Sequence, residues 1–455
     1  MHTATATLRV RLGAVRSLPS RSHAVPVLQA FAVTLMVIPS DTVIKPVGGA
    51  GYPAALIGMF AFVAWGAAVV LGLHDPLRHR HPIRGVLWLF WVTSLVSYVL
   101  MDRPLLTPLE TRGADRFVMQ LAAVTGVALL AAECLRSLDD IRRVLRVLSW
   151  GGAFCGIVAG LQFWLSYDVT PTLRLVPGFS VNHENLAIID RDALNRVSGT
   201  AIHPIELGVV AGMLLPLAIH VAMYDTARTA RRRWAPVAMI GIAIPASVSR
   251  SAVLSVAVAM ATFIVALPPR QRVVAFGAVP FALAAVFMTA VGVISTLTSF
   301  FRAGTNDPSV QARTDDYPLV ERLVREAPWF GHGGGTYIQQ NTFDILDNQF
   351  LKTAVELGLV GLVLFTLYLV VPFCVALGSR RRTRDPELRL LCGALAGAAL
   401  AATVCSFTFD SFSFPMFLNV HALVLGLAGA ASRLARVHAP PPSPNDPSPR
   451  AQAVA

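Results

Sequence analysis

Long apolar runs constrain this chain more than any other feature of its sequence. Runs of about 17 to 25 apolar residues recur from one end to the other, the length that a helix needs to cross a bilayer. Hydrophobic residues make up 55% of the chain and charged residues only 14%. The pattern predicts an all-α polytopic membrane protein with about twelve transmembrane helices. The predicted spans are approximately 25–41, 54–73, 85–101, 117–135, 145–166, 205–223, 235–248, 251–267, 273–296, 349–377, 390–408 and 415–436.

Arginine-rich connections alternate with connections of low or mixed charge. The segments HDPLRHRHPIR, RSLDDIRRVLR, TARTARRRW, PPRQR and SRRRTRDPELR follow every second predicted span, on the side of the basic N-terminal tail. Cytoplasmic loops carry an excess of Arg and Lys, so both termini are predicted to be cytoplasmic. The formal net charge of +12 is interpreted as orienting the helices, and no nucleic-acid partner is expected.

The predicted organisation is a single membrane domain between two tails. Residues 1–24 are interpreted as a cytoplasmic tail, residues 25–436 as the transmembrane catalytic domain, and residues 437–455 as a disordered cytoplasmic tail. Two long extracytoplasmic connections are expected, at about 167–203 and, as a large loop between helices 9 and 10, at about 297–348.

The larger connection is expected to contain an amphipathic helix. Asp315, Asp316 and Pro318 are typical of a helix start. They precede apolar residues at helical spacing: Leu319, Val320, Leu323 and Val324. Such a helix could lie along the membrane surface and roof a site.

The stretch from Gly331 to Gly361 combines a glycine-rich polar loop with an apolar helix. Ionisable residues at membrane depth are expensive, so this stretch is the leading candidate for a functional site. Two interpretations of the glycine run remain open, an anion-binding nest of backbone amides and a plain flexible turn. In the nest, Gly333 and Gly334 would bind substrate, with His332 as a hydrogen-bonding residue. The run lacks the GK[ST] ending of a nucleotide P-loop.

Asp347 stands immediately before the predicted tenth span, where it could be a helix N-cap, a general base whose pKa is raised by desolvation at an apolar boundary, or both. Asn348 beside it could orient a substrate. Lys352 and Glu356 are four residues apart on one helical face, so they could neutralise each other, and in a membrane the pair still marks a face turned toward protein or water. Both are retained as candidate substrate-binding residues.

Three arginines fall in the connections predicted to face outward: Arg196, Arg250 and Arg313. The guanidinium group suits bidentate binding of phosphate, and three of them could together hold a pyrophosphate. The alternative is that each is an interfacial residue or the partner of a loop carboxylate. The very short turn at Arg250 has no obvious structural need of a charged side chain.

No metal or cofactor is expected. The connection at 167–203 and its flank contain His183, Glu184, Asp190, Asp192, His203 and Glu206, but their spacing matches no zinc motif. Pro204 is predicted to begin the sixth span. The five cysteines lie within or at the ends of apolar runs without CxxC spacing, which favours small core residues over disulfides or metal ligands.

The motifs together resemble the family of O-antigen ligases and O-antigen polymerases (WaaL and Wzy type), which are membrane glycosyltransferases. DNQFLKTAVELGLVGL is similar to the family's HN-x-x-L followed by E-x-G-x-x-G, and it is preceded by an Arg, an amphipathic segment ending in Pro328, and GHG. RVSGTAIHPIELG and VSRSAVL resemble the family's R-x-x-G and Ser-Arg motifs. The resemblance covers about residues 180–365.

The resemblance implies a GT-C-like helical fold in the cytoplasmic membrane with an extracytoplasmic active site. It implies metal-independent, inverting transfer of a glycan from an undecaprenyl-pyrophosphate carrier to an acceptor hydroxyl on a glycan, lipid or wall polymer. Arg196, Arg250 and Arg313 would then clamp the pyrophosphate. Many ligases have His where this chain has Asp347, which would make Asp347 the base and leaves polymerase and ligase activity both open.

Two further classes of function remain as alternatives. Twelve spans with cytoplasmic termini also fit a secondary transporter or a flippase for lipid-linked glycans. Transporters usually place charges and broken helices near mid-membrane in repeated halves, whereas this sequence places its polar residues in outward connections. The second alternative is a non-catalytic scaffold protein.

Overall fold

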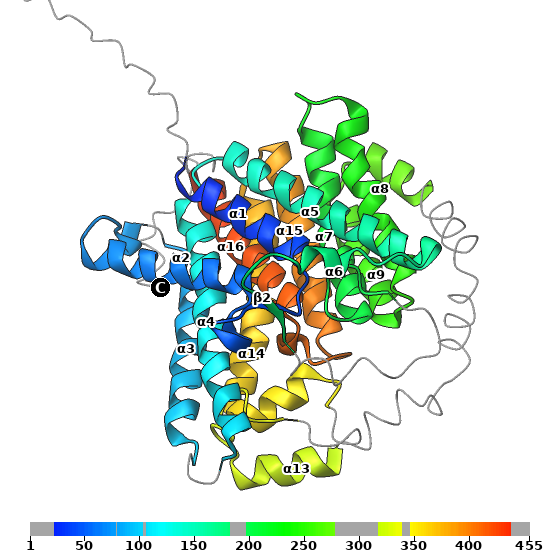
Figure 1. Cartoon of the computed structure of the whole chain (residues 1–455). Coiled ribbons are helices and arrows are strands. Elements are labelled where there is room, and N and C mark those ends of the chain that lie inside the picture. The colour runs from blue at the N-terminus through cyan, green and yellow to red at the C-terminus, as the bar shows by residue number, and fades with distance from the viewer. Residues whose placement is uncertain are drawn as a thin grey trace, which may run out of the picture.

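The structure is a computed structural model of the whole chain. The residues that it describes are 22–78, 80–102, 106–182, 197–277, 317–338 and 346–437. This part of the chain is a bundle of helices with one short antiparallel ribbon (Figure 1). In the ribbon, β1 (Thr42–Ile44) pairs with β2 (Phe179–Val181).

Helices occur at the predicted spans wherever the structure describes them. Their bounds are α1 Ala24–Val37, α2 Pro53–Val70, α3 Pro82–Leu100, α4 Pro108–Cys134, α5 Leu138–Leu165, α7 Pro204–Tyr224, α8 Ala230–Ala246, α9 Arg250–Ala266, α14 Gln349–Arg382, α15 Pro386–Cys405 and α16 Pro415–Val437. The shorter helices are α6 Thr170–Leu173 and α13 Tyr317–Glu326, with single turns η1 Gly48–Ala50, η2 Pro76–Arg78 and η6 Ser411–Ser413.

Eight of the described helices are long and apolar enough to cross a membrane, and α1 and α9 are shorter apolar helices. This confirms the polytopic class. The total of twelve is not established, because the predicted ninth span at 273–296 lies largely outside the described residues and α8 begins with a run of arginines.

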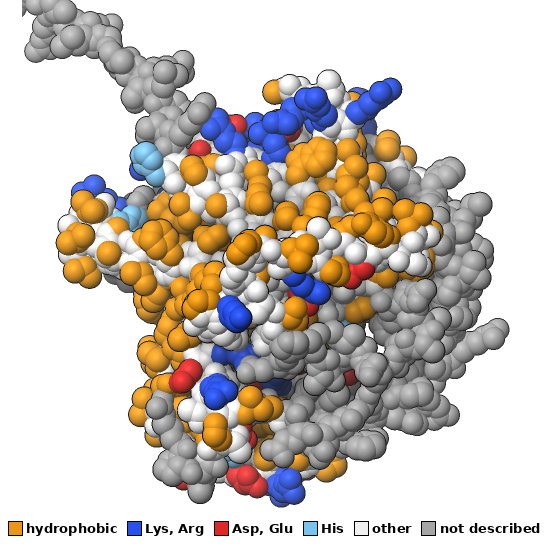
Figure 2. Space-filling view, viewed as in Figure 1, with side chains coloured by type: hydrophobic (Ala, Val, Ile, Leu, Met, Phe, Trp, Pro, Cys, Tyr) orange, Lys and Arg blue, Asp and Glu red, His pale blue; other side chains and the backbone are white. Residues whose placement is uncertain are grey.

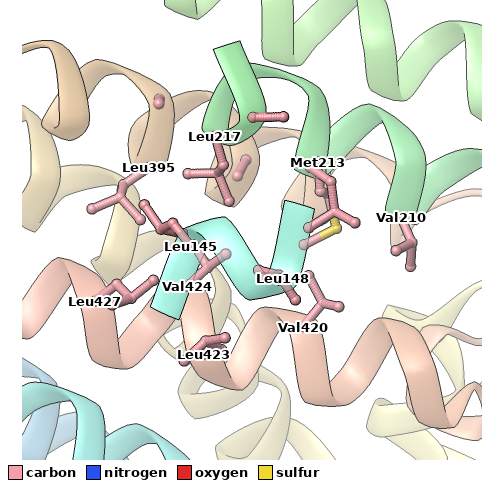
Figure 3. Packing of buried hydrophobic residues seen from close by; sticks show 14 of the residues in the cluster. Leu145, Leu148, Val210, Met213, Leu217, Leu395, Val420, Leu423, Val424 and Leu427 are labelled. Atoms are coloured by element: carbon pink, nitrogen blue, oxygen red, sulfur yellow. The ribbon is translucent and has the colours of Figure 1, made fainter. Parts of the chain in front are cut away.

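The core surrounds α16, whose membrane-length segment is entirely buried. Figure 3 shows leucine, valine and methionine side chains of α5, α7, α15 and α16 meeting there, among them Leu148, Met213, Leu395 and Val424. Small residues let neighbouring helices approach closely. A Cβ on Gly397 of α15, for example, would lie 2.5 Å from the Ala259 carbonyl oxygen of α9.

The arginine-rich connections gather at one end of the bundle. Figure 2 shows a cap of Lys and Arg side chains above a broad belt of hydrophobic ones. Ion pairs join these connections to one another: Arg142 to Glu387 and Arg146 to Asp225. The connections before α5, α8 and α15 therefore lie side by side.

Glu133 forms a buried polar cluster near the arginine-rich end. Its carboxylate accepts hydrogen bonds from Trp65 Nε1 (2.9 Å) and Arg84 Nε (2.8 Å), and it lies 2.6 Å from His74 Nε2 and 3.1 Å from His81 Nε2. One carboxylate thus connects α2, the segment after it, α3 and α4.

The predicted amphipathic helix is present as α13. Its apolar residues Val320, Leu323 and Val324 pack in a small cluster with Val355 and Leu351 of α14. Asp315 and Asp316, which were expected to start this helix, lie outside the described residues.

Candidate functional site

A cavity of about 380 Å³ lies between the N-terminal halves of α2, α4, α14 and α16, beneath the β1–η1 segment. Its volume falls within the range of about 300–1,000 Å³ usual for small-molecule sites. Polar side chains from six segments line it: Ser40, Arg116, Gln120, Asn182, Lys352, Glu356, Asp410, Ser413 and Asn419. Its aromatic lining residues are Tyr52, Phe117, Tyr337 and Phe412.

Lys352 is held by the loop between α15 and α16. Its Nζ donates to Ser413 Oγ (2.8 Å) and lies 3.5 Å from Asp410 Oδ2. The side chains of Lys352 and Asp410 are 12% and 8% exposed, so water screens this pair little. Lys352 is thus paired with Asp410, and its charge also acts on Glu356 one turn further along α14.

Glu356 lies one turn further along α14 and is buried. The backbone amides of Gly335 and Tyr337 hydrogen-bond to its carboxylate. Its other oxygen, Oε1, is buried without a hydrogen-bond partner among the described residues. Glu356 thus brings a partly satisfied carboxylate to the cavity wall.

Tyr52 closes the cavity on the α2 side. Burial, reinforced by the negative charge of Glu206, raises the pKa of the Tyr52 phenol far above its ordinary value. The hydroxyl therefore stays protonated, and it donates to the Leu35 carbonyl (3.3 Å).

Immediately beyond Glu356, α14 is broken at Gly358. In a continuous α-helix each carbonyl accepts from the amide four residues later. Here the bonds that Leu359 N and Val360 N would make to Val355 O and Glu356 O are absent. Four bonds to the segment 328–333 replace them. These are His332 N to Val355 O (3.1 Å), Gly333 N to Glu356 O (2.9 Å), Leu359 N to Pro328 O (2.8 Å) and Val360 N to Trp329 O (3.2 Å). The loop completes the backbone hydrogen bonding of the broken helix.

Glycine is required on both sides of this contact. Gly331 (φ +66°) and Gly358 (φ +68°) both have left-handed backbone, and a Cβ on either would lie 2.4 Å from backbone atoms of the other segment. The GHG and E-x-G-x-x-G sequences are therefore two halves of one structure.

This arrangement uses two of the amides of the predicted anion nest. The amides of His332 and Gly333 are used within the protein, so these two do not form the predicted nest. The His332 ring lies 3.0 Å from the Leu323 carbonyl through Nε2. Gly334 packs against Phe117, where a Cβ would be 2.6 Å from the ring. The run positions the loop over α4 and α14.

Asn348 caps α14, and Asp347 does not. The Asn348 Oδ1 accepts from the amides of Phe350 (2.9 Å) and Leu351 (3.4 Å), which is the geometry of an N-cap. Asp347 precedes the cap and is exposed, contrary to the expectation that an apolar boundary would desolvate it. The N-cap of α14 is therefore Asn348 and not Asp347.

His203 and Arg250 stand at the starts of two other helices. His203 caps α7 by accepting from Ile205 N (3.2 Å) through Nδ1, and Pro204 begins that helix as predicted. Arg250 is the first residue of α9, after Val248, which has a positive φ of 43° that is unusual for a β-branched residue.

The start of α9 also touches the loop that carries part of the cavity wall. The Oγ of Ser251 lies 2.8 Å from Thr408 Oγ1, in the same loop as Asp410 and Ser413. His203 similarly contacts Phe414 edge to face, with ring centroids 6.0 Å apart. Both helix starts therefore border this loop.

Glu206, one of the residues considered for a metal, serves a structural purpose. Its Oε1 accepts from the amides of Met416 (2.6 Å) and Phe417 (3.1 Å), and Oε2 accepts from Ile202 N (2.9 Å). The carboxylate thus satisfies the first amides of α16. Within the described ranges, no group of three or more His, Cys, Asp or Glu residues could hold a metal ion.

The structure brings together only some of the predicted site residues. Lys352 and Glu356 line the cavity, while Asp347, Asn348, His203 and Arg250 lie at helix starts at the same end of the bundle. Arg196 and Arg313 lie outside the described residues. Several polar cavity residues were not predicted from the sequence, including Arg116, Asp410 and Asn419. Their signal was available, since each is polar within or beside an apolar run.

The fold and the cavity define a multi-pass, mostly helical membrane protein with a polar site formed where several helices begin. Residues 234–366 match the family model described as O-antigen ligase. The match confirms the resemblance drawn from the motifs for this part of the chain. The matched segment contains Arg250, the loop at 331–335, Asp347 and Glu356. No curated protein matches this chain.

Proposed function

We propose that this protein transfers a glycan from an undecaprenyl-pyrophosphate carrier to an acceptor hydroxyl at the outer face of the cytoplasmic membrane. The family match carries this proposal, because it covers the broken helix, its partner loop and the residues leading into α14. The family supports polysaccharide ligase or polymerase activity in general. The donor, the side of the membrane and the roles of individual residues belong to the proposal.

The proposed chemistry is an inverting displacement that needs no metal. Asp347 takes the proton of the acceptor hydroxyl. The acceptor oxygen then attacks the anomeric carbon of the donor glycan while the bond between that carbon and the pyrophosphate breaks. The pyrophosphate leaves as an anion and needs no proton. Support for Asp347 comes from the cap geometry, since Asn348 already serves as the N-cap and leaves Asp347 exposed.

In this mechanism Arg196, Arg250 and Arg313 hold the pyrophosphate and stabilise the charge that builds on it. Arg250 is at the start of α9, beside the loop that borders the cavity. A helix N-terminus favours an anion through its amides and its dipole, which supports a phosphate position there.

The test is transfer by purified protein in proteoliposomes supplied with oligosaccharide linked to undecaprenyl pyrophosphate. We expect a glycosidic product from the wild type and at least a 100-fold loss in Arg250→Ala and Arg313→Ala, because removal of one oxyanion-type donor commonly costs about that much. Both variants should insert at wild-type level. Unchanged product formation in both variants would contradict the arginine clamp.

The product also identifies the class of reaction. A ladder that grows by whole repeat units indicates a polymerase, and movement of the glycan to a second lipid or wall polymer indicates a ligase. Translocation of lipid-linked glycan across the bilayer without any new glycosidic bond would instead identify a flippase.

A further inference from the structure

We infer that a second cavity, at the arginine-rich end of the bundle, binds the phosphate group of an anionic phospholipid through Arg136 and Arg433. It shares no lining residue with the cavity described above. The inference does not depend on the proposed glycan transfer.

The second cavity has a volume of about 650 Å³ and lies where α4 and α16 end and α1 begins. The start of α1 is near the end of α16 in Figure 1. Arg136, Arg433 and His74 form part of its polar wall, and Val27, Leu130 and Leu434 form an apolar one. The cavity therefore combines cationic and apolar surface.

Arg433 is fixed beside Arg136 by the end of α4. Its Nε donates to the Ala132 carbonyl and its Nη2 to the Leu135 carbonyl, both at 2.6 Å. Leu135 is the residue before Arg136. The two arginines therefore line the cavity from neighbouring positions, although they are almost 300 residues apart in the chain.

The same bonds cover the negative end of α4. The carbonyls at a helix C-terminus repel an anion, and here donors from α16 and from the segment before α1 engage them. Ser22 Oγ donates to the Cys134 carbonyl (2.6 Å), beside the two carbonyls that Arg433 binds. An anion in the cavity thus meets the donors of these bonds and not bare carbonyls.

The carboxylate among the described lining residues is balanced inside the protein. The Glu133 side chain is 0% exposed and forms an ion pair with Arg84, and it also contacts His74 Nε2 (2.6 Å). Because Arg84 balances Glu133, the charges of Arg136 and Arg433 leave the lining with an excess of positive formal charge. This excess favours an anionic ligand.

The two walls together select an anionic lipid. Guanidinium groups suit bidentate binding of phosphate, whereas a free phosphate ion would make no use of the apolar wall. Leu71 and Leu73, just before His74, are 70% and 80% exposed and offer further apolar surface to acyl chains. Basic pockets between helices on the cytoplasmic side of membrane proteins bind anionic head groups, and this end is predicted to be cytoplasmic.

Native mass spectrometry tests the site on the purified full-length protein in detergent. Titration with dioleoylphosphatidylglycerol should show one bound lipid, and dioleoylphosphatidylcholine, which has no net charge, should bind at least 10-fold more weakly. Arg136→Gln and Arg433→Gln should each weaken binding of phosphatidylglycerol about 10-fold, the loss expected for one charge-assisted hydrogen bond. Arg136 is exposed, so Arg136→Gln should keep the wild-type melting temperature even if Arg433→Gln disturbs the end of α4.

Arg231→Gln is the matched control. Arg231 is an exposed arginine in the first turn of α8, within one of the arginine-rich connections, and it does not line the cavity. We expect wild-type lipid binding in this variant. Equal loss in Arg231→Gln and Arg136→Gln would indicate attraction to the charged surface in general and overturn the site.

Two further outcomes would also overturn the inference. One is equal affinity for phosphatidylglycerol and phosphatidylcholine, or affinity for phosphatidylglycerol that is unchanged in Arg136→Gln. The other is inorganic phosphate that binds through Arg136 as tightly as phosphatidylglycerol does, since this would identify a site for the free ion and not for a lipid.

Discussion

Asp347 and Asn348 are adjacent, yet the fold uses them differently. Asn348 satisfies two amides of the first turn of α14, and Asp347, which precedes the cap, is exposed. A residue that is not needed for the helix start can be changed without affecting it. The role of Asp347 can therefore be tested without removing the N-cap of α14.

We predict that Asp347→Asn abolishes transfer while the protein keeps its melting temperature. Loss of a general base typically lowers the rate by about 100-fold to 10,000-fold. The measurement is product formation from lipid-linked oligosaccharide, with thermal unfolding followed in parallel.

Asn348→Ala is the companion variant. It removes the cap and should lower stability by about 1 kcal/mol. Full activity in Asp347→Asn would show that Asp347 is not the base, and a large loss of stability in that variant would show that it has a structural role.

At the scale of elements, the interruption of α14 is held by its partner loop. Gly358 has φ 68° and ψ −171°, a region that is essentially restricted to glycine. We predict that Gly358→Ala destabilises the protein by more than about 1–2 kcal/mol, the cost of left-handed backbone alone, because its Cβ also meets the Trp329 carbonyl.

The matched control lies on the same helix. A Cβ on Gly378 would meet no atom within 4 Å, so Gly378→Ala should be neutral or stabilise the helix by up to about 1 kcal/mol. Thermal unfolding in detergent compares the two variants. Equal stability of both would mean that the break is not required.

The Glu133 cluster gives a second prediction for packed elements. Glu133→Ala leaves Arg84, His74 and His81 without their shared acceptor, and breaking a buried ion pair costs about 3–5 kcal/mol. Glu321→Gln, in an exposed pair with Arg325 on α13, should cost about 0–1 kcal/mol. Comparable melting temperatures for the two variants would contradict the structural role of Glu133.

At the scale of the whole molecule, the two ends of the bundle predict its orientation. Leu175 lies in a connection predicted to be outside, and Arg228 lies in one predicted to be cytoplasmic. In a chain whose own cysteines are replaced, a membrane-impermeant maleimide should label Leu175→Cys in intact cells and Arg228→Cys only after permeabilisation. The reverse pattern would invert the proposed topology.

The helices were predictable because each apolar run carries its own signal. Predicted spans such as 205–223 agree closely with α7, whereas α4 begins earlier than its apolar run because Thr107 and Glu110 form a capping box. The break at Gly358 was not predictable, since a glycine within an apolar run looks like any other until its partner loop is known.

The site was predictable only where one segment contains it. Lys352 and Glu356 share a helix face, and local spacing identified them. Asn419 and Arg116 reach the cavity from helices some 300 positions apart in the chain, and local patterns carry no information on such contacts. The choice between Asp347 and Asn348 as cap also needed coordinates, because both residue types cap well.

The bonds between the segment 328–333 and α14 also bear on how the chain enters the membrane. An isolated α14 would expose two carbonyls and two amides in lipid, where water does not compensate them. The segment that pairs with them is synthesised earlier, so it is already present when the ribosome completes the helix. A fragment that starts at α14 should therefore insert poorly, and the correct kink should form only in chains that have already placed this loop.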